Sequence, residues 1–124
     1  MFAKSYLRPE MVVEDVGTGT GLIAAGLALL VHQVHVLDGS AAMLAVAWKN
    51  LSPFNNIVFH EADGQSLPLP DTSIDVVFTN MYLRPFPDPQ TAIHEMVRVL
   101  KVMYFWKPSV RSGQAADSKS AMWS

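Results

Sequence analysis

The sequence predicts a doubly wound α/β fold with a parallel sheet, and two observations support this. Short apolar segments of strand length alternate with segments whose apolar residues recur at helical spacing. That order is typical of parallel strands joined by crossover helices. The first apolar segment also ends in an acid followed by Gly-x-Gly-x-Gly at residues 17–21. A glycine-rich turn between a strand and a helix is typical of nucleotide-binding sheets.

The first strand and helix are predicted on either side of the glycines. Met11–Val16 is an apolar segment of strand length, and Gly21–Val31 has apolar residues at helical spacing. The residues expected on the buried face of this helix are Leu22, Ile23, Gly26, Leu27 and Leu30. The glycines permit a tight turn in which the backbone approaches a ligand closely.

A second strand and helix follow in the same order. Val34–Leu37 is a short β-rich segment that ends at Asp38. Ser40 is suited to cap a helix over Ala41–Asn50, and Pro53 ends it. The apolar residues expected on the inner side of this helix are Met43, Leu44, Ala47 and Trp48.

Two strands and a helix are predicted in the second half. Ile57–His60 and Ile74–Thr79 are the third and fourth strands, with a turn-rich segment between them. Asp88-Pro89, an N-cap acid before a proline, begins a helix. Its apolar residues at helical spacing are Ala92, Ile93, Met96, Val97 and Leu100.

The last part of the chain predicts one further strand and a tail. Met103–Trp106 is expected to form a fifth strand. From Lys107 onward the chain is rich in Ser, Gly, Ala and Gln, which indicates a disordered tail over residues 107–124. We therefore expect one domain over residues 1–106.

Composition excludes several classes of function. The net charge of −2 provides no basic surface for nucleic acid. The absence of cysteine excludes disulfides and thiolate metal sites. The absence of cysteine also leaves the compartment open, with a cytoplasmic location as the default expectation. The longest apolar run, Leu22–Val31, is too short to span a membrane, so we expect no transmembrane segment. Only 16% of residues are charged, and a buried parallel sheet explains part of this low fraction. A missing part of the domain or a partner would explain the rest.

Polar residues follow the ends of the predicted strands. Asp15, Gly17, Asp38, Asp63 and Asn80 all fall at or just beyond such ends. Because ligands of parallel α/β sheets bind at the carboxyl ends of the strands, these residues are expected to form one site. An acid about twenty residues after the glycines, such as Asp38, is placed to accept hydrogen bonds from ribose hydroxyls.

The acids favour one nucleotide-like ligand over another. Gly19-x-Gly21-x-x-Ala24 also fits a loose dinucleotide pattern, so NAD has to be considered. A carboxylate at Asp15, however, opposes a pyrophosphate and suits an ammonium group. Asp63 adds an acid that can accept from an exocyclic amine. An amino acid joined to adenosine satisfies both acids, and S-adenosylmethionine is such a molecule.

Four segments carry a family resemblance. VVEDVGTGTG, VHVLDGSAAMLAVA, EADGQSLPLPDTSIDVVFTN and DPQTAIHEMVRVLK resemble the class I methyltransferases that depend on S-adenosylmethionine. The likeness is greatest to the branch with the ubiquinone and menaquinone biosynthesis methyltransferases, and it covers roughly Pro9 to Lys101. The resemblance implies a Rossmann-like fold and a small-molecule methyl acceptor.

The resemblance assigns residues to the methionine end of the cofactor. Asp15 would lie near the methionine amino group, and Gly17, Thr18 and Gly19 would wrap the methionine and ribose portion. Asn80 would lie nearest the sulfonium and the acceptor.

It also assigns residues to the adenosine end. Asp38 matches the acid that binds the ribose, and Gly39 and Met43 would flank the adenine. Asp63 and Gly64 match the positions that hold the adenine edge by side chain and backbone.

Other polar residues are expected to have structural roles. Asp75 matches an acid at the start of strand four that is generally structural in the family. His32 and His35 are expected to point to opposite faces and bind no metal. His60 and His94 are also expected to be structural or solvated.

The sequence departs from the family after Lys101. The family usually turns through Pro-Gly-Gly into strand five, whereas this chain continues Val102-Met103-Tyr104. The family's last two strands have no counterpart, so we expect an incomplete sheet in a C-terminally truncated domain. Strand five would then be an apolar edge that favours self-association.

The predicted activity is methyl transfer by in-line displacement. Because the cofactor already activates the methyl group, the protein mainly orients the reactants and needs no dedicated catalytic residue. Tyr82 and Asn80 are the nearest candidates to orient an acceptor. Two alternatives remain open: a non-catalytic module that binds S-adenosylmethionine, and an NAD(P)-linked oxidoreductase.

Overall fold

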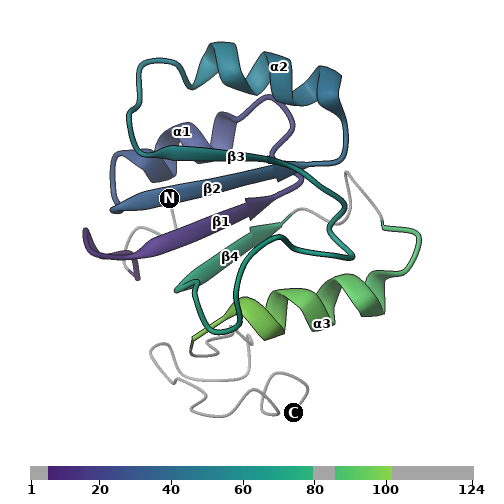
Figure 1. Cartoon of the computed structure of the whole chain (residues 1–124). Helices are drawn as coiled ribbons and strands as arrows, with labels where there is room; N and C mark the ends of the chain where they lie inside the picture. The colour runs from purple at the N-terminus through teal and green to yellow at the C-terminus, as the bar shows by residue number, and fades with distance from the viewer. Residues whose placement is uncertain (1–5, 80–85, 102–124) are drawn as a thin grey trace, which may run out of the picture.

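The fold is a parallel sheet with helices on both faces. The computed structural model describes residues 6–79 and 86–101. The strands are β1 (Val12–Val16), β2 (Gln33–Asp38), β3 (Ile57–Glu61) and β4 (Val76–Thr79), in the sheet order β3-β2-β1-β4. The helices are α1 (Leu22–Ala28), α2 (Ala41–Asn50) and α3 (Pro89–Val99). Figure 1 shows α1 and α2 on one face of the sheet and α3 on the other. The predicted α/β class is therefore confirmed.

The central strand β1 pairs in parallel with β2 on one side and β4 on the other. The strand order thus reverses at β1, and such a switch point is where sheets of this kind open a crevice beyond the strand ends. The chain after α3 returns to the sheet at an isolated parallel bridge between Ile74 and Leu100. The predicted fifth strand, Met103–Trp106, and the predicted tail lie outside the described residues.

Strand β4 begins at Val76, two residues later than predicted. Asp75 explains this start, because its backbone N–H donates to the Val12 carbonyl while its Oδ2 accepts from the Val12 N–H at 2.8 Å. Lys101 Nζ lies 3.5 Å from the other carboxylate oxygen. Asp75 therefore joins the starts of two strands, in agreement with its predicted structural role.

The buried face of α1 was predicted only in part: Leu27 is buried as expected, but Leu22 and Ile23 are not. The structure buries Ala24, Leu27 and Ala28, whereas Leu22 is 81% exposed and Ile23 is 46% exposed. No polar residue occurs from 21 to 31, so the sequence does not indicate which face of this helix is exposed. The direction of the helix is instead set by its start at Gly21, which has φ 84°.

The predicted stripe on α2 is also only partly buried. Ala47 is fully buried, but Trp48 is 65% exposed and its ring lies tilted beside Phe59, with 4.9 Å between ring centroids. The predicted cap is present, because the Ser40 hydroxyl accepts from the Met43 N–H. Capping was therefore easier to predict from the sequence than the orientation of the helix.

Helix α3 covers the other face of the sheet as predicted. Asp88 caps its start by accepting from the Thr91 N–H, and Pro89 follows at the first turn. Its buried side chains belong to a core cluster with Val16 and Leu37 of the sheet. The buried α3 residues are Ala92, Met96 and Val99. This packing holds α3 beside the strand ends where the site lies.

Candidate functional site

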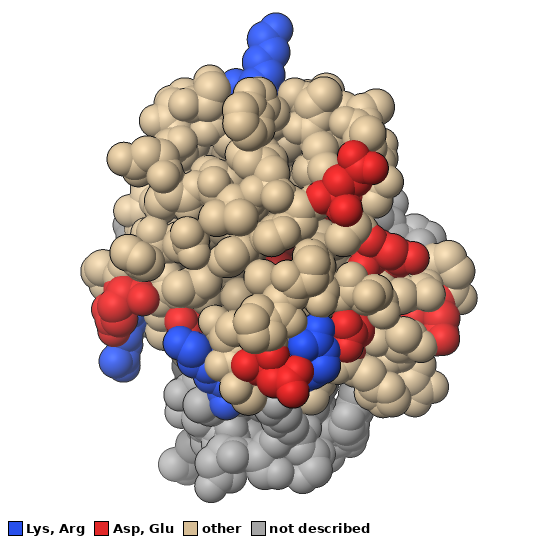
Figure 2. Space-filling model, viewed as in Figure 1, with Lys and Arg blue, Asp and Glu red and all other residues tan. Residues whose placement is uncertain are grey.

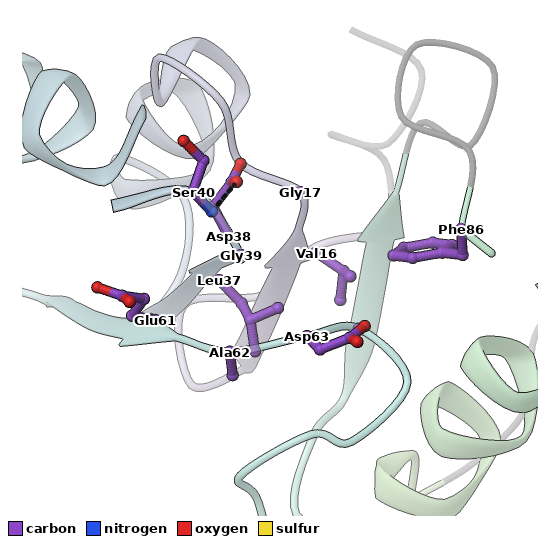
Figure 3. Close-up of a pocket in the computed structure, with 11 residues that line it drawn as sticks. Val16, Gly17, Leu37, Asp38, Gly39, Ser40, Glu61, Ala62, Asp63 and Phe86 are labelled. Atoms are coloured by element: carbon purple, nitrogen blue, oxygen red, sulfur yellow. Dashed lines mark hydrogen bonds between the residues drawn. The ribbon is translucent and has the colours of Figure 1, made fainter. Parts of the chain in front are cut away.

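A cleft of about 580 Å³ opens at the carboxyl ends of β1, β2 and β3 (Figure 3). It lies at the switch point of the sheet, as expected for this fold. Its lining residues are Val16, Gly17, Leu37, Asp38, Gly39, Ser40, Glu61, Ala62, Asp63, Gly64 and Phe86. Three of them are acids and none is Lys, Arg or His, so the described lining carries only negative charge.

The glycine turn is pinned to the end of β2. Gly17, Gly19 and Gly21 all have positive φ, between 57° and 84°, a conformation that side chains rarely adopt. The N–H groups of Gly17 and Thr18 both donate to the Leu37 carbonyl, at 2.8 and 3.0 Å. The turn therefore has a fixed position over the edge of the sheet.

Asp38 joins this turn to the start of α2. Its Oδ2 accepts from the Gly19 N–H at 3.0 Å, and its Oδ1 accepts from the Ser40 N–H at 3.0 Å. The residue is buried, with 2% of its surface exposed, yet it lines the cleft. Its carboxylate therefore joins the glycine turn to the start of α2 at the wall of the cleft.

Asp15 lies behind the glycine turn. Its Oδ2 accepts from the Thr18 hydroxyl at 2.9 Å. Burial raises the pKa of the Asp15 carboxyl, the Thr18 hydrogen bond opposes this rise, and the neighbouring Asp38 charge adds to it. Because burial without an opposite charge is costly, a cationic group at this position would relieve the cost.

Two more acids follow β3. Glu61 is in register with Asp38 at the strand ends and is exposed. Asp63 is also exposed, and its Oδ1 accepts from the Gln65 N–H at 2.9 Å, which fixes the turn after the strand. Figure 2 shows Asp and Glu side chains along the right-hand edge of the view, where the strands end, with no Lys or Arg visible among the described residues there.

The structure brings most of the predicted site residues together. Those that line the cleft are Gly17, Asp38, Gly39, Asp63 and Gly64. Thr18 and Gly19 belong to the turn next to this lining, and Asp15, near the end of β1, accepts from the Thr18 hydroxyl. The Met43 methyl group lies 3.7 Å from the point that a Cβ on Gly19 would occupy, so Met43 borders the same turn. The predicted Asn80 and Tyr82 lie outside the described residues.

Several lining residues were not predicted. The strand register between Asp38 and Glu61 was the signal that could have indicated Glu61. The apolar members missed are Val16, Leu37, Ala62 and Phe86. Phe86 has no local signal, because it reaches the cleft only through the packing of the segment that enters α3.

The histidines do not line the cleft. His35 Nδ1 lies 2.9 Å from His60 Nε2, the rings stack with centroids 5.1 Å apart, and His35 Nε2 lies 3.2 Å from Gln33 Oε1. Burial lowers the pKa of both imidazoles, and for His35 the neighbouring His60 lowers it further. Within residues 6–79 and 86–101, no group of three or more His, Cys, Asp or Glu could hold a metal ion.

A family match and two curated relatives indicate the same kind of protein. The family described as "Methyltransferase domain" matches residues 14–103. The chain is 38% identical over 96 residues to the chloroplastic 2-methyl-6-phytyl-1,4-hydroquinone methyltransferase of Arabidopsis thaliana, covering 76% of this chain and 28% of that protein. It is 35% identical over 100 residues to the demethylmenaquinone methyltransferase of Desulfitobacterium hafniense, covering 76% of this chain and 40% of that protein.

A solved structure shows the same fold. The SAM-dependent methyltransferase of Aquifex aeolicus superposes with a TM-score of 0.73 at 26% identity, covering 91% of this chain and 65% of that one. By contrast, the chain spans less than half the length of each of the two curated relatives named above. No helix in the described part of the chain is long and apolar enough to cross a membrane.

Proposed function

This chain belongs to the methyltransferase domain family, and we propose that its cleft binds S-adenosylmethionine, the cofactor of such enzymes, for methyl transfer to a small-molecule acceptor. One observation carries the proposal. The buried Asp38 carboxylate fixes the glycine turn through Gly19 and faces the cleft at the same time. A ribose seated on Asp38 would therefore bring the rest of the cofactor against the turn.

The chemistry of the cleft fits this cofactor. S-adenosylmethionine carries an ammonium group, a sulfonium and two ribose hydroxyls, all of which are attracted to carboxylates. The described lining provides Asp38, Glu61 and Asp63 with no basic residue among them. The same charges oppose the pyrophosphate of NAD(P), so this feature argues against the oxidoreductase alternative.

We assign the methionine end to the glycine turn. Asp15, with its carboxyl buried, is proposed to accept from the methionine ammonium group, and Gly17, Thr18 and Gly19 to wrap the methionine and ribose. The positive φ values of Gly17 and Gly19 support this role, because they keep side chains away from the approaching ligand. Asn80 is proposed to lie nearest the sulfonium.

We assign the adenosine end to the segments after β2 and β3. Asp38 is proposed to accept from both ribose hydroxyls, and Gly39 and Met43 to flank the adenine. Asp63 and Gly64 are proposed to hold the adenine edge by side chain and backbone. The position of Gly39, Asp63 and Gly64 along one cleft supports this assignment.

The chain contributes binding and orientation to the reaction. When bound, the cofactor supplies a methyl group that its positive charge already activates. The fixed turn and the buried carboxylates orient the reactants, so we propose no catalytic base and no metal ion. Tyr82 is a proposed contact for the acceptor, together with Asn80.

The acceptor class is proposed from the relatives. The two curated relatives are named for a hydroquinone and for demethylmenaquinone, so a prenylated hydroquinone is the first acceptor to test. The purified chain would be incubated with this acceptor and with S-adenosylmethionine labelled on its methyl group. We expect labelled acceptor and S-adenosylhomocysteine. Binding without transfer would favour the non-catalytic alternative, and absence of binding would contradict the proposal.

The proposal also covers the location of the protein and its partners. We propose a cytoplasmic location, no nucleic-acid partner, and self-association through an exposed edge of the sheet. The net charge of −2 supports the second point. Light scattering of the purified chain tests the third, and a monomer at every concentration would contradict it.

A further inference from the structure

The ring of Phe86 leaves no room for a side chain at Gly64. Gly64 is buried and lacks the positive φ of the glycines at 17, 19 and 21, so its backbone conformation is open to other residues. A Cβ at this position would lie 2.9 Å from Cζ and 3.2 Å from Cδ1 of Phe86, and closer still to Cε1. The Phe86 ring therefore occupies the space that a side chain on residue 64 would fill.

Two kinds of contact fix the position of the Phe86 ring. The Asp88 N–H donates to Gln65 Oε1 at 2.9 Å, which fastens the segment that enters α3 to the turn after β3. Phe86 also packs against the core cluster that contains Val16 and Leu37. The ring thus has a defined place between the turn and the core.

From this place the ring forms one wall of the cleft. Figure 3 shows Phe86 across the cleft from Asp38 and Ser40, with Asp63 between them. Phe86 is the one aromatic residue among the described lining. An aromatic face beside a carboxylate matches a purine, because the base can stack on the ring while its exocyclic amine donates to the acid.

We propose that Phe86 positions the purine base of the cofactor by stacking, and that Gly64 is required to make room for its ring. This inference rests on the proposed function. It adds Phe86 to the residues proposed to contact the cofactor. Phe86 belongs neither to the glycine turn nor to the acids at the strand ends. The two positions then act as one unit, because either change removes the ring from the same place.

The test compares substitutions at the two positions in the full chain. Calorimetric titration with S-adenosylhomocysteine and with adenosine would be carried out on Phe86→Leu, Gly64→Ala and the double variant. We expect each single substitution to lower the affinity for both ligands about tenfold, which corresponds to the loss of one base–aromatic stack. The double variant should be no weaker than either single variant, because the ring can be lost only once.

A matched control is provided by another glycine. A Cβ on Gly26 would meet no heavy atom within 4 Å, so Gly26→Ala should leave both affinities unchanged. Thermal unfolding of each variant identifies any loss of fold, and Phe86→Leu keeps an apolar side chain at this place. If Gly64→Ala fails to fold, Phe86→Leu alone decides.

Three results would overturn the inference. Phe86→Leu could leave both affinities unchanged, the two single effects could add in the double variant, or the loss could affect S-adenosylhomocysteine but spare adenosine. The last result would mean that the ring contacts the amino-acid end of the ligand and not the base. If the unaltered chain binds neither ligand, the proposed function itself is wrong, and this inference with it.

Discussion

At the scale of a single residue, Glu14 is a buried carboxyl group whose ionisation is disfavoured by its position in the sheet. Its side chain is fully buried on the central strand, and neither carboxylate oxygen has a hydrogen-bond partner among the described residues. Burial raises its pKa to about 7, and the charges of Asp15 and Glu95 add to this while Arg98 opposes it. His35 is its register partner on β2. The carboxyl is therefore held mainly as the neutral acid below neutral pH.

This burial predicts a pH dependence of stability. The folded-state pKa is raised from 4.5 to about 7, so the folded state binds the proton more tightly than the unfolded state. Stability is retained below pH 4.5 and lost as the pH rises toward 7, by about 3 kcal/mol in all. Urea unfolding across this range should show the loss in the unaltered chain and a smaller loss in Glu14→Gln.

Glu10 provides the control for that measurement. It is exposed, so Glu10→Gln should keep the pH dependence of the unaltered chain. Equal slopes for Glu14→Gln and the unaltered chain between pH 4.5 and 7 would show that Glu14 is not held neutral by burial.

Asp38 supports a second prediction at the residue scale. Its carboxylate bonds the glycine turn and is proposed to bind the ribose, so Asp38→Ala should remove both contributions. Affinity for S-adenosylmethionine should fall at least about tenfold, since charge-assisted hydrogen bonds contribute about 1.5–3 kcal/mol each. Calorimetry checks this, with Glu10→Ala as the control, since Glu10 is an exposed acid outside the described lining of the cleft. Unchanged affinity would remove Asp38 from the site.

At the scale of elements, α3 positions the turn that carries Asp63 and Gly64. Arg98 donates to the carbonyls of Leu67 and Leu69, at 2.9 Å each, and pairs with Glu95 and Asp71 at 2.7 Å. The adjacent carboxylates hold the pKa of Arg98 above its ordinary value. One side chain therefore joins the segment after β3 to the helix.

Loss of this junction is expected to loosen the cleft. Arg98→Gln should lower the free energy of unfolding by about 2 kcal/mol, because hydrogen bonds to a charged group are lost. It should also weaken cofactor binding, since the segment that carries Asp63 is released. Chemical denaturation and calorimetry measure the two effects, with exposed Arg8→Gln as the control. Full stability in Arg98→Gln would contradict the role given to this junction.

The elements also show how far sequence reasoning reaches. Caps and strand ends were predictable, because Ser40, Asp88 and Pro89 act on their own backbone within a few residues. The buried face of α1 was not, because a segment without polar residues has no preferred face. Asp38 and Asp63 were predicted from their place after strands, whereas Glu61, the third acid of the described lining, was not. Phe86 was missed because its contact with Gly64 is formed only in the folded chain.

At the scale of the whole molecule, the described fold contains the cofactor side of a methyltransferase domain. The chain covers 28% and 40% of its two curated relatives but 65% of the Aquifex aeolicus structure. The glycine turn, Asp38 and the segment after β3 all lie within the matched residues 14–103. Binding of the cofactor is thus the part of the proposed activity to which these residues are assigned.

The central claim is that the cleft selects an adenosyl amino acid. The most direct measurement is calorimetric titration of the purified full chain with S-adenosylmethionine, S-adenosylhomocysteine and NAD under one set of conditions. We expect saturable binding of both adenosyl ligands and none of NAD, because the acids of the cleft attract an ammonium and repel a pyrophosphate. Binding of NAD without binding of either adenosyl ligand would contradict the account.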